Sequence, residues 1–426
     1  MSALRSCALG CLFLVLSGPV HAQRNAWIAT WATSPEPADT DPNEPLLKIE
    51  NQTVRQRMRV SIGGAQVRIR FSNEYGASPL LIGAASVAMS NDFSSVRPGS
   101  IQTVTFAGRN STIIPAGAPV LSDAVSFPVG AGDEISISIY FPKRVGTPTL
   151  HTLALKRAVV SPPGDHTRAE KVEGGAVSQS SILVSGVLVP AQVSQRLIVM
   201  FGDSFVDGDG STVDADNSWP SQLGRRLART PEGSKVAVVN AGVAGNRLLS
   251  DGSSSGFSSF GVNALARFDR DVRVLPGLTH VVLLEGLNDI GFPGAKLSNH
   301  VLASAAEART IQDLIDGYLQ LISRAHAHGV KLIGATIGPF EGVQFLSGYY
   351  SESKEALRQE VNKWIRSSGS FDGVIDIDAV LRDPDHPSRV LPKFLSKDRL
   401  HPNDAGYRAM ADAVDLALFG RQSTGL

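Results

Sequence analysis

The chain has 426 residues, long enough for two or three domains, and its 42% hydrophobic and 19% charged residues are an ordinary globular composition. Lys and Arg together number 40, as do Asp and Glu, so the formal net charge is zero. A neutral chain lacks the basic excess that attracts nucleic acids and anionic membranes, so we expect no nucleic-acid partner.

The first 22 residues have the pattern of a secretory signal peptide. Arg5 provides a positive charge, and an apolar run follows over residues 7–17, shorter than the ~20 residues that a membrane-spanning helix needs. The small-residue sequence VHA ends at Ala22, where we expect cleavage. The alternative is a buried N-terminal helix. Cleavage would give a secreted or periplasmic protein without a stable membrane anchor, and it would remove both cysteines.

Residues 23–190 have the two-residue hydrophobic period of β-strands. Apolar and polar side chains alternate in TVRQRMRVSI (residues 53–62), QVRIRF (66–71) and EISISIYF (134–141). Turn signals such as IGG and IPAGAP separate these runs. Many short, half-buried strands at this spacing predict an all-β domain of the sandwich or jelly-roll kind.

One face of the first of these strands carries only arginines, namely Arg55, Arg57 and Arg59. Such a stripe could bind an acidic polymer. The interpretation that we favour is a solvated strand face, because charged side chains on alternate positions usually point to water.

After Arg196 the period changes, and apolar runs alternate with helix-like stretches over residues 196–426. The apolar runs are RLIVMF (196–201), VAVVN (236–240), HVVLLE (280–285), KLIGATI (331–337) and GVIDI (373–377). The predicted helices lie at 219–230, 263–272, 310–329, 353–369 and 403–419. Continuous apolar strands between helices indicate a parallel sheet covered on both faces. Five of them predict a doubly wound, flavodoxin-like α/β domain.

Reactive side chains follow four of these strands. The segments are GDS (202–204), NAGVAGNR (240–247), EGLNDIG (285–291) and, after a longer loop, KDRLHPNDAGY (397–407). In open α/β sheets, ligands bind at the carboxyl ends of the strands, so these segments should meet at one edge of the sheet. A serine, a glycine-rich turn, an asparagine and an Asp-x-x-His together are an acyl-transfer constellation.

The chemistry assigns a role to each residue. The hydroxyl of Ser204 is a weak nucleophile that needs an adjacent base, and His401 can take its proton. Asp398, three residues before His401, can hold the other ring nitrogen. The backbone N–H groups of Ser204 and Gly245 and the side-chain amide of Asn288 could donate to the oxyanion of a tetrahedral intermediate.

These segments resemble the four blocks of the SGNH (GDSL) hydrolase superfamily, and the resemblance covers residues 196–420. The matching residues are Ser204 in FGDSFVDG, Gly245 in NAGVAGN, Asn288 in GLND, and Asp398 with His401 in DRLHPND. Gly245 is preferred over Gly242 because the family spaces its glycine as Asn-x4-Gly, counted here from Asn240. The resemblance implies a flavodoxin-like α/β/α sheet and ester or thioester hydrolysis without metal or cofactor.

Asp203 and Asp289, next to the predicted nucleophile and the predicted oxyanion donor, are expected to support the site rather than react. The sequence GDSFV lacks the second glycine of a Gly-x-Ser-x-Gly elbow, which argues against an ordinary α/β-hydrolase. The stretches from WIATWATSPEP to VRIRFSNEYG resemble the β-rich domain that precedes the catalytic domain in a group of secreted bacterial SGNH proteins.

The acidic stretch that begins at Asp207 and Asp209 resembles the start of an EF-hand calcium loop. The glycine expected at position six is Thr212, and the glutamate expected at position twelve is Ser218. We therefore predict no metal site there.

Together, these features predict an exported serine esterase that acts on short acyl esters, with O-acetylated carbohydrate as the leading substrate. A lipase, lysophospholipase or arylesterase would use the same machinery. A carbohydrate-binding protein with an inactive hydrolase half is the alternative from another class, and the intact Ser-Gly-Asn-His set argues against it.

Overall fold

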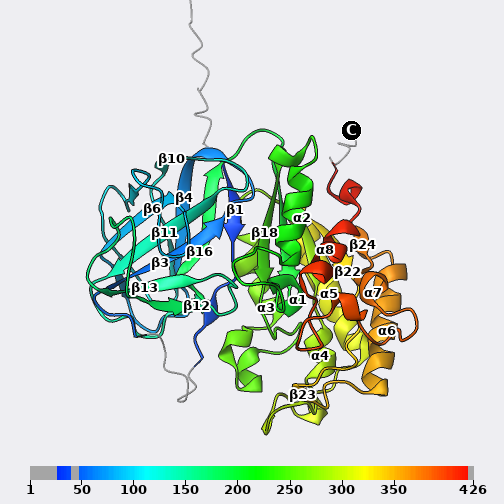
Figure 1. Cartoon of the computed structure of the whole chain (residues 1–426). Helices are drawn as coiled ribbons and strands as arrows, with labels where there is room; N and C mark the ends of the chain where they lie inside the picture. Colours follow the sequence, from blue (N-terminus) through cyan, green and yellow to red (C-terminus); the bar gives the residue numbers. More distant parts are fainter. Residues whose placement is uncertain (1–25, 40–47, 421–426) are drawn as a thin grey trace, which may run out of the picture.

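The computed structural model describes residues 26–39 and 48–420. The signal peptide predicted for residues 1–22 lies outside the described residues. Figure 1 shows two parts side by side, one made almost entirely of β-strands and one in which helices cover a parallel sheet. The all-β and doubly wound architectures predicted from the sequence are both confirmed.

Two antiparallel sheets form the β-rich part. The five-stranded sheet contains β1 (Trp27–Ala32), β16 (Val184–Pro190), β4 (Gly64–Asn73), β10 (Val125–Val129) and β9 (Ala118–Leu121). The six-stranded sheet runs in the order β14 (Ala176–Ser178), β13 (Ala158–Pro163), β3 (Gln52–Arg59), β11 (Glu134–Phe141), β6 (Ala84–Met89) and β7 (Gln102–Val104). Smaller pairings join β15 (Ser181–Ile182), β12 (Thr149–His151) and β2 (Glu36–Pro37), and also β5 (Leu80–Ile82) with β8 (Thr112–Ile114).

The alternation predicted for these strands places their apolar residues in the core. Ile69 on β4 and Val54 on β3 are fully buried, and Ile137 on β11 lies opposite Gln56 of β3 in the antiparallel register. Strand β3 departs from the prediction because both of its faces are covered. Gln56, on the apolar face, is also buried, since its side chain bonds the backbone N–H and C=O of Ile182.

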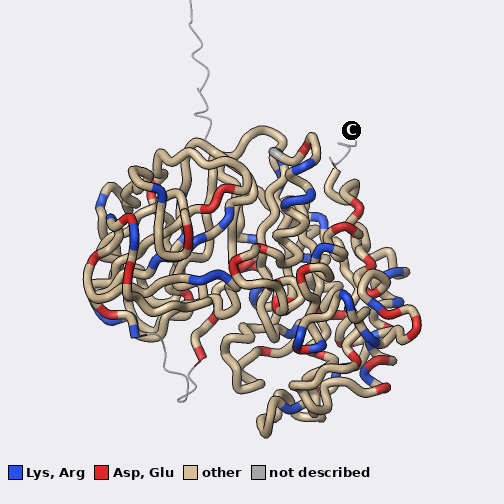
Figure 2. Tube along the Cα trace, in the orientation of Figure 1, with Lys and Arg blue, Asp and Glu red and all other residues tan. Residues whose placement is uncertain are grey.

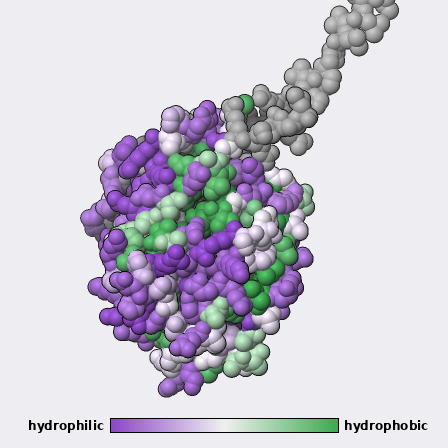
Figure 3. Space-filling model, turned by 90° about the vertical axis from the view of Figure 1, so that its right-hand side faces the viewer, coloured by the Kyte–Doolittle hydropathy of each residue, from purple (hydrophilic) through white to green (hydrophobic). Residues whose placement is uncertain are grey.

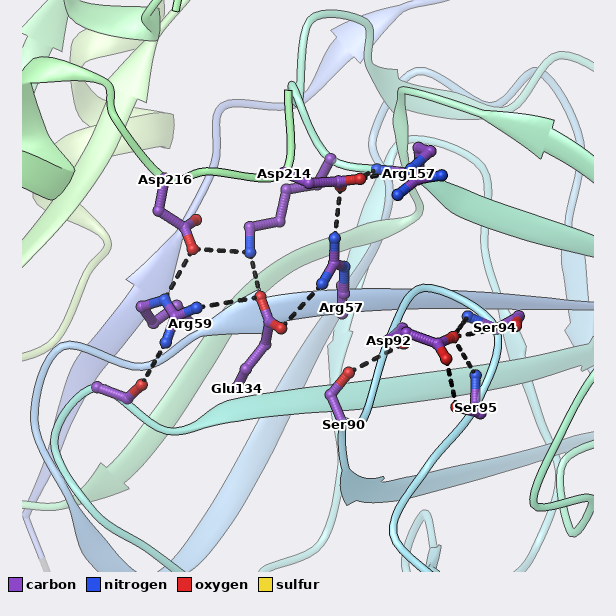
Figure 4. A network of polar contacts seen from close by, with 12 residues as sticks. Arg57, Arg59, Ser90, Asp92, Ser94, Ser95, Glu134, Arg157, Asp214 and Asp216 are labelled. Carbon is purple, nitrogen blue, oxygen red and sulfur yellow. Dashed lines mark hydrogen bonds and ion pairs between the residues drawn. The ribbon is translucent and has the colours of Figure 1, made fainter. Parts of the chain in front are cut away.

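The prediction of a solvated arginine face is wrong for Arg55 and Arg57 and holds for Arg59, whose side chain is 40% exposed. Arg55 is 1% exposed and donates to backbone carbonyls of the loop over residues 166–170. Arg57 pairs with Asp214 at 2.6 Å, and Arg59 pairs with Asp216 at 2.7 Å (Figure 4). Both aspartates belong to the α/β part, so Arg57 and Arg59 form a contact between the two parts of the chain, whereas Arg55 bonds only within the β-rich part.

This contact includes further charges. Glu134 accepts from Arg57 at 3.0 Å, Lys156 lies 2.9 Å from Asp216, and Arg157 also binds Asp214. Periodicity identified the polar face of β3, but it could not reveal that a loop about 155 residues later would cover that face.

The parallel sheet has the order β18 (Val236–Gly242), β17 (Arg196–Gly202), β19 (Leu278–Leu284), β22 (Lys331–Ala335) and β24 (Gly373–Ile375). All four neighbouring pairs are parallel. The first strand along the chain therefore lies second in the sheet, which is the flavodoxin-like order. Each strand corresponds to one of the five predicted apolar runs.

The helices of this part are α1 (Ser204–Asp207), α2 (Trp219–Ala228), α3 (Ala264–Phe268), α4 (Leu287–Gly291), α5 (Ile311–His326), α6 (Glu352–Ser367), α7 (Ile377–Leu381) and α8 (Asp404–Asp412). Helix α5 begins with a capping box, in which the side chains of Thr310 and Asp313 each accept from the backbone N–H of the other. Helix α8 ends earlier than predicted, because Asp415 caps a separate 3₁₀ turn over Leu416–Phe419.

Lys and Arg residues are interspersed with Asp and Glu residues along the backbone of both parts of the chain (Figure 2). On the face shown in Figure 3, hydrophobic residues gather in a band among mostly hydrophilic ones. Among the described residues, no helix has the length and apolar character needed to cross a membrane.

Candidate active site

Ser204 lies at the turn between β17 and the short helix α1. The turn is tight, because a side chain at Gly202 would place its Cβ 1.9 Å from the carbonyl oxygen of Leu284. Asp203 caps the helix by accepting a hydrogen bond from the N–H of Phe205 at 3.0 Å. The Ser204 side chain is thereby fixed at the carboxyl edge of the sheet, and only 6% of the residue is exposed.

His401 and Asp398 reach this serine from the other end of the domain. Nε2 of His401 lies 2.9 Å from Ser204 Oγ, and Nδ1 lies 2.8 Å from Asp398 Oδ2. The other carboxylate oxygen of Asp398 accepts from the backbone N–H groups of Leu400 and His401. The structure thus brings the three residues predicted as nucleophile, base and orienting acid into one hydrogen-bonded chain.

The charges around His401 favour its protonated form. Burial disfavours that form, but the nearby Asp209 and Asp398 outweigh it and raise the pKa of His401 above its ordinary 6.5. Burial likewise opposes ionisation of Asp398, yet its hydrogen bonds with His401 and Ser396 lower the pKa of this carboxyl below its usual range. Asp398 therefore stays ionised and can stabilise an imidazolium that forms during a reaction.

The predicted oxyanion donors follow three neighbouring strands: Ser204 begins α1 after β17, Gly245 lies in the loop after β18, and Asn288 lies in α4 after β19. Within the described residues, the backbone N–H groups of Ser204 and Gly245 donate no hydrogen bond, so they are free to bind an oxyanion. The amide nitrogen of Asn288 gives one hydrogen to the carbonyl of Asn246 at 2.9 Å. Its amide oxygen accepts from the Tyr349 hydroxyl at 2.7 Å, which fixes the orientation of the amide.

Gly245 cannot be replaced without strain. Its φ of +75° lies in the left-handed region, and an added Cβ would lie 2.4 Å from the ring of Phe260. This aromatic contact and the positive φ together hold the loop after β18 in one conformation.

Asp289, which is predicted to support the site, bonds the backbone of the loop after β18. Its carboxylate accepts from the N–H groups of Leu248 at 2.6 Å and Leu249 at 3.0 Å, so α4 is tied to the loop that follows Gly245. Burial raises the pKa of Asp289 to about 6 and that of Asp203 to about 7. Neither carboxylate is among the hydrogen-bond partners of Ser204 or His401.

Two buried ionisable residues beneath the site are not among the residues predicted from the sequence. Arg267 on α3 is 0% exposed and donates to the carbonyl of Gly202 and to the side chain of Asn246, both at 2.7 Å. Glu285 lies 3.8 Å from it, and burial raises the pKa of this carboxyl well above 4.5. An arginine on the inward face of a predicted helix was the one signal in the sequence that could have found Arg267.

Asp207 and Asp209, in the acidic stretch after Ser204, contact two different histidines. Asp207 binds a histidine of the β-rich part, His151, at 3.0 Å. Asp209 lies 3.6 Å from Nδ1 of His401. The two carboxylates therefore belong to separate clusters and do not form the start of a calcium loop.

Comparison with known proteins finds a family match within the α/β part of the chain. Residues 200–409 match the GDSL-like Lipase/Acylhydrolase family, and this range includes all the predicted site residues. A search of curated proteins found no match.

Several solved structures resemble about half of the chain. A GDSL-like lipase from Bacteroides thetaiotaomicron is 16% identical, with 54% of this chain and 90% of that chain covered and a TM-score of 0.37. A carbohydrate acetylesterase from Sinorhizobium meliloti is 14% identical, with 51% and 96% covered and a TM-score of 0.38. The M. smegmatis aryl esterase is 17% identical, with 51% and 95% covered and a TM-score of 0.38. Residues 200–409 therefore form a domain of the GDSL-like lipase/acylhydrolase family, and the protein is a hydrolase.

Proposed function

We propose that this protein is an exported serine esterase that hydrolyses short acyl esters, with O-acetylated carbohydrate as the leading substrate. The observation that carries the proposal is the unbroken hydrogen-bonded chain from Ser204 Oγ through the ring of His401 to Asp398. That arrangement is what a serine hydroxyl needs in order to act as a nucleophile near neutral pH.

In the acylation step, Ser204 Oγ forms a bond to the carbonyl carbon of the ester, and its proton moves to Nε2 of His401. The carbonyl oxygen becomes an oxyanion, which accepts hydrogen bonds from the N–H groups of Ser204 and Gly245 and from the amide of Asn288. When the intermediate collapses, the bond between carbon and the alcohol oxygen breaks. His401 gives its proton to the leaving alcohol, and the acyl group stays on Ser204.

Deacylation repeats the step with water. His401 removes a proton from water, whose oxygen adds to the acyl carbon, and the second tetrahedral intermediate uses the same donors. Collapse of this intermediate returns the proton to Ser204 Oγ and releases the carboxylic acid. The enzyme is restored, and ester and water have become acid and alcohol.

The preference for a short acyl group is supported by the aromatic packing beside the predicted oxyanion donors. The Phe260 ring contacts Gly245 and stacks on Phe257 with ring centroids 4.9 Å apart. The ring centroid of Phe292 lies 5.7 Å from that of Phe260 and 5.9 Å from that of Tyr349, the residue that binds Asn288. We take this packing, in which Phe292 and Tyr349 are buried, to limit the room for an acyl chain beside the donors. Two further elements of the proposal are export of the protein and carbohydrate as the alcohol part of the ester. Both rest on the predicted signal peptide and on the additional β-rich part.

The test compares the purified protein with its Ser204→Ala variant on aryl esters from acetyl to long-chain acyl, with acetylated xylan and acetylated pectin alongside. Ser211→Ala, a buried serine in the following loop, is the matched control and should keep full activity. We expect acid release to peak at acetyl, to include acetate from polymer, and to disappear only in Ser204→Ala. A peak at long acyl chains would make the protein a lipase. Glycan binding without any release of acid would sink the esterase proposal.

A further inference from the structure

A histidine of the β-rich part is buried against the nucleophile helix. His151, the last residue of β12, places Nε2 3.0 Å from Oδ1 of Asp207, the last residue of α1. Its Nδ1 lies 2.8 Å from Glu36 on β2. All three residues are at most 4% exposed, so this cluster is closed to solvent.

The ring carries a positive charge between two carboxylates. Burial disfavours that charge, but Asp207 and Glu36 outweigh it and raise the pKa of His151 well above 6.5. A buried ion pair of this kind is weak evidence for stability, because its attraction is offset by the cost of removing the charges from water. Its position is the more informative feature.

Asp207 connects His151 to the loop that carries Gly245. Oδ2 of Asp207 accepts a hydrogen bond from the N–H of Ala244 at 3.0 Å, and Ala244 immediately precedes Gly245. The backbone carbonyl of Asp207 accepts from the side chain of Asn240, at the start of the same segment, at 2.9 Å. One carboxylate therefore touches His151 on one side and the oxyanion loop on the other, only three residues after Ser204.

A second connection reaches the other side of Gly245. The hydroxyl of Ser34, two residues before Glu36, accepts from Arg267 at 3.1 Å. Arg267 in turn holds the side chain of Asn246 and the carbonyl of Gly202. The residues flanking Gly245 are thus both linked to segment 34–36 of the β-rich part.

We propose that His151 is a positioning residue for this reaction: through Asp207, it holds the loop over residues 244–246 so that the Gly245 N–H faces the oxyanion beside Ser204. The β-rich part is then a component of the active site rather than an appended module. This inference rests on the proposed esterase function, because it assigns a role to the same oxyanion site.

A positioning role and a merely structural role predict different kinetics. If the oxyanion donor is misplaced, only the transition state loses an interaction, so kcat falls while KM stays near its original value. A misplacement of about 1 Å can cost on the order of 10²-fold in rate. A structural role would lower the melting temperature and leave kcat per folded molecule unchanged.

The experiment measures kcat and KM on an acetyl aryl ester, and the melting temperature, for His151→Gln, Asp207→Asn and the double variant. Asp216→Asn, which weakens the other contact between the two parts without touching residues 244–246, is the matched control. We expect each single variant to lose about 10²-fold in kcat with little change in KM. The double variant should lose no more than the singles, because both act through one path. Asp216→Asn should lower the melting temperature and keep kcat.

The outcomes separate this inference from the proposed function. Suppose that turnover by the wild-type protein depends on Ser204, but that both single variants keep the wild-type kcat. That result overturns the positioning role and leaves the proposed function standing. Losses that multiply in the double variant also overturn it, because they place the two residues on independent paths. If His151→Gln does not fold, Asp207→Asn decides the matter by the same split between kcat and KM. A wild-type protein without Ser204-dependent turnover overturns the proposed function itself.

Discussion

The carboxylate of Asp209 lies 3.6 Å from Nδ1 of His401, the same ring nitrogen that Asp398 binds at 2.8 Å. Two negative charges therefore face one imidazole, and both Asp209 and Asp398 raise the pKa of His401 against the effect of burial. Because Asp209 is about one-third exposed, it can be replaced without leaving a hole in the core.

The first prediction concerns the pH profile. A general base must be neutral, so kcat/KM should fall as the pH drops through the raised pKa of His401, above 6.5. Asp209→Asn removes one of the anions that stabilise the imidazolium, so the pKa of His401 should fall and the acidic limb should move to lower pH. Asp412→Asn, an exposed carboxylate on α8, serves as the control and should leave the profile in place. An unmoved limb in Asp209→Asn, or one that moves to higher pH, would contradict the assignment of His401 as the base.

A second prediction addresses the amide of Asn288. Asn288→Ala should lower kcat by about 10²–10³-fold and leave KM nearly unchanged, because the lost hydrogen bond forms only with the oxyanion. Tyr349→Phe should cause a smaller loss of the same kind, since the Tyr349 hydroxyl only orients this amide. Tyr350→Phe changes the neighbouring tyrosine, whose ring packs on Phe340, and should have no effect on kcat. A rise in KM as the main effect would instead place Asn288 in substrate binding.

The contact between the two parts of the chain gives a third prediction. Asp216→Ala removes a carboxylate that is only 11% exposed and that pairs with both Lys156 and Arg59. The Arg59 side chain is 40% exposed. We expect a loss of about 1–3 kcal/mol in the free energy of unfolding, less than for a fully buried pair because Arg59 remains hydrated. Urea unfolding at low and high salt measures it, and the loss should shrink as salt screens the charges. Glu173→Gln, in the exposed pair with Lys171, should leave the midpoint where it is.

The fourth prediction follows from the charge on His151. Its pKa in the folded protein is raised above the ordinary value, so its contribution to stability is fully present below about pH 6.5 and is lost as the pH rises through the folded pKa. The difference in melting temperature between the wild-type protein and His151→Gln should therefore be larger in mildly acidic buffer than in strongly alkaline buffer. An equal difference at both extremes would mean that the ring is neutral and that its neighbours do not hold a charge there.

The fold of the α/β part could be predicted from the sequence because the signals for its strands and helices are local. Each buried parallel strand is a continuous apolar run, and the reactive residues follow these runs in chain order. The rule that the ends of parallel strands meet at one edge then predicts that Ser204, Asn288 and His401 lie together. The structure agrees with this placement in the 2.9 Å contact between Ser204 and His401.

The parts that the sequence did not predict all depend on distant partners. The pattern of β3 does not show that Arg57 pairs with Asp214 and Arg59 with Asp216. Asp207 looks like part of an acidic turn until His151 reaches it from a strand 56 residues earlier. No period or motif marks such pairs, because each residue type is also common on a solvated surface.

The most direct test of the central claim is to trap the acyl-enzyme. The protein is mixed with an acetyl aryl ester, quenched in acid at short times, digested, and examined by mass spectrometry. The account predicts a transient acetyl group on the peptide that contains Ser204, on that hydroxyl, formed at the rate of the aryl-alcohol burst and absent from Ser204→Ala. Steady release of acid without any adduct on Ser204, or turnover that persists in Ser204→Ala, would contradict it.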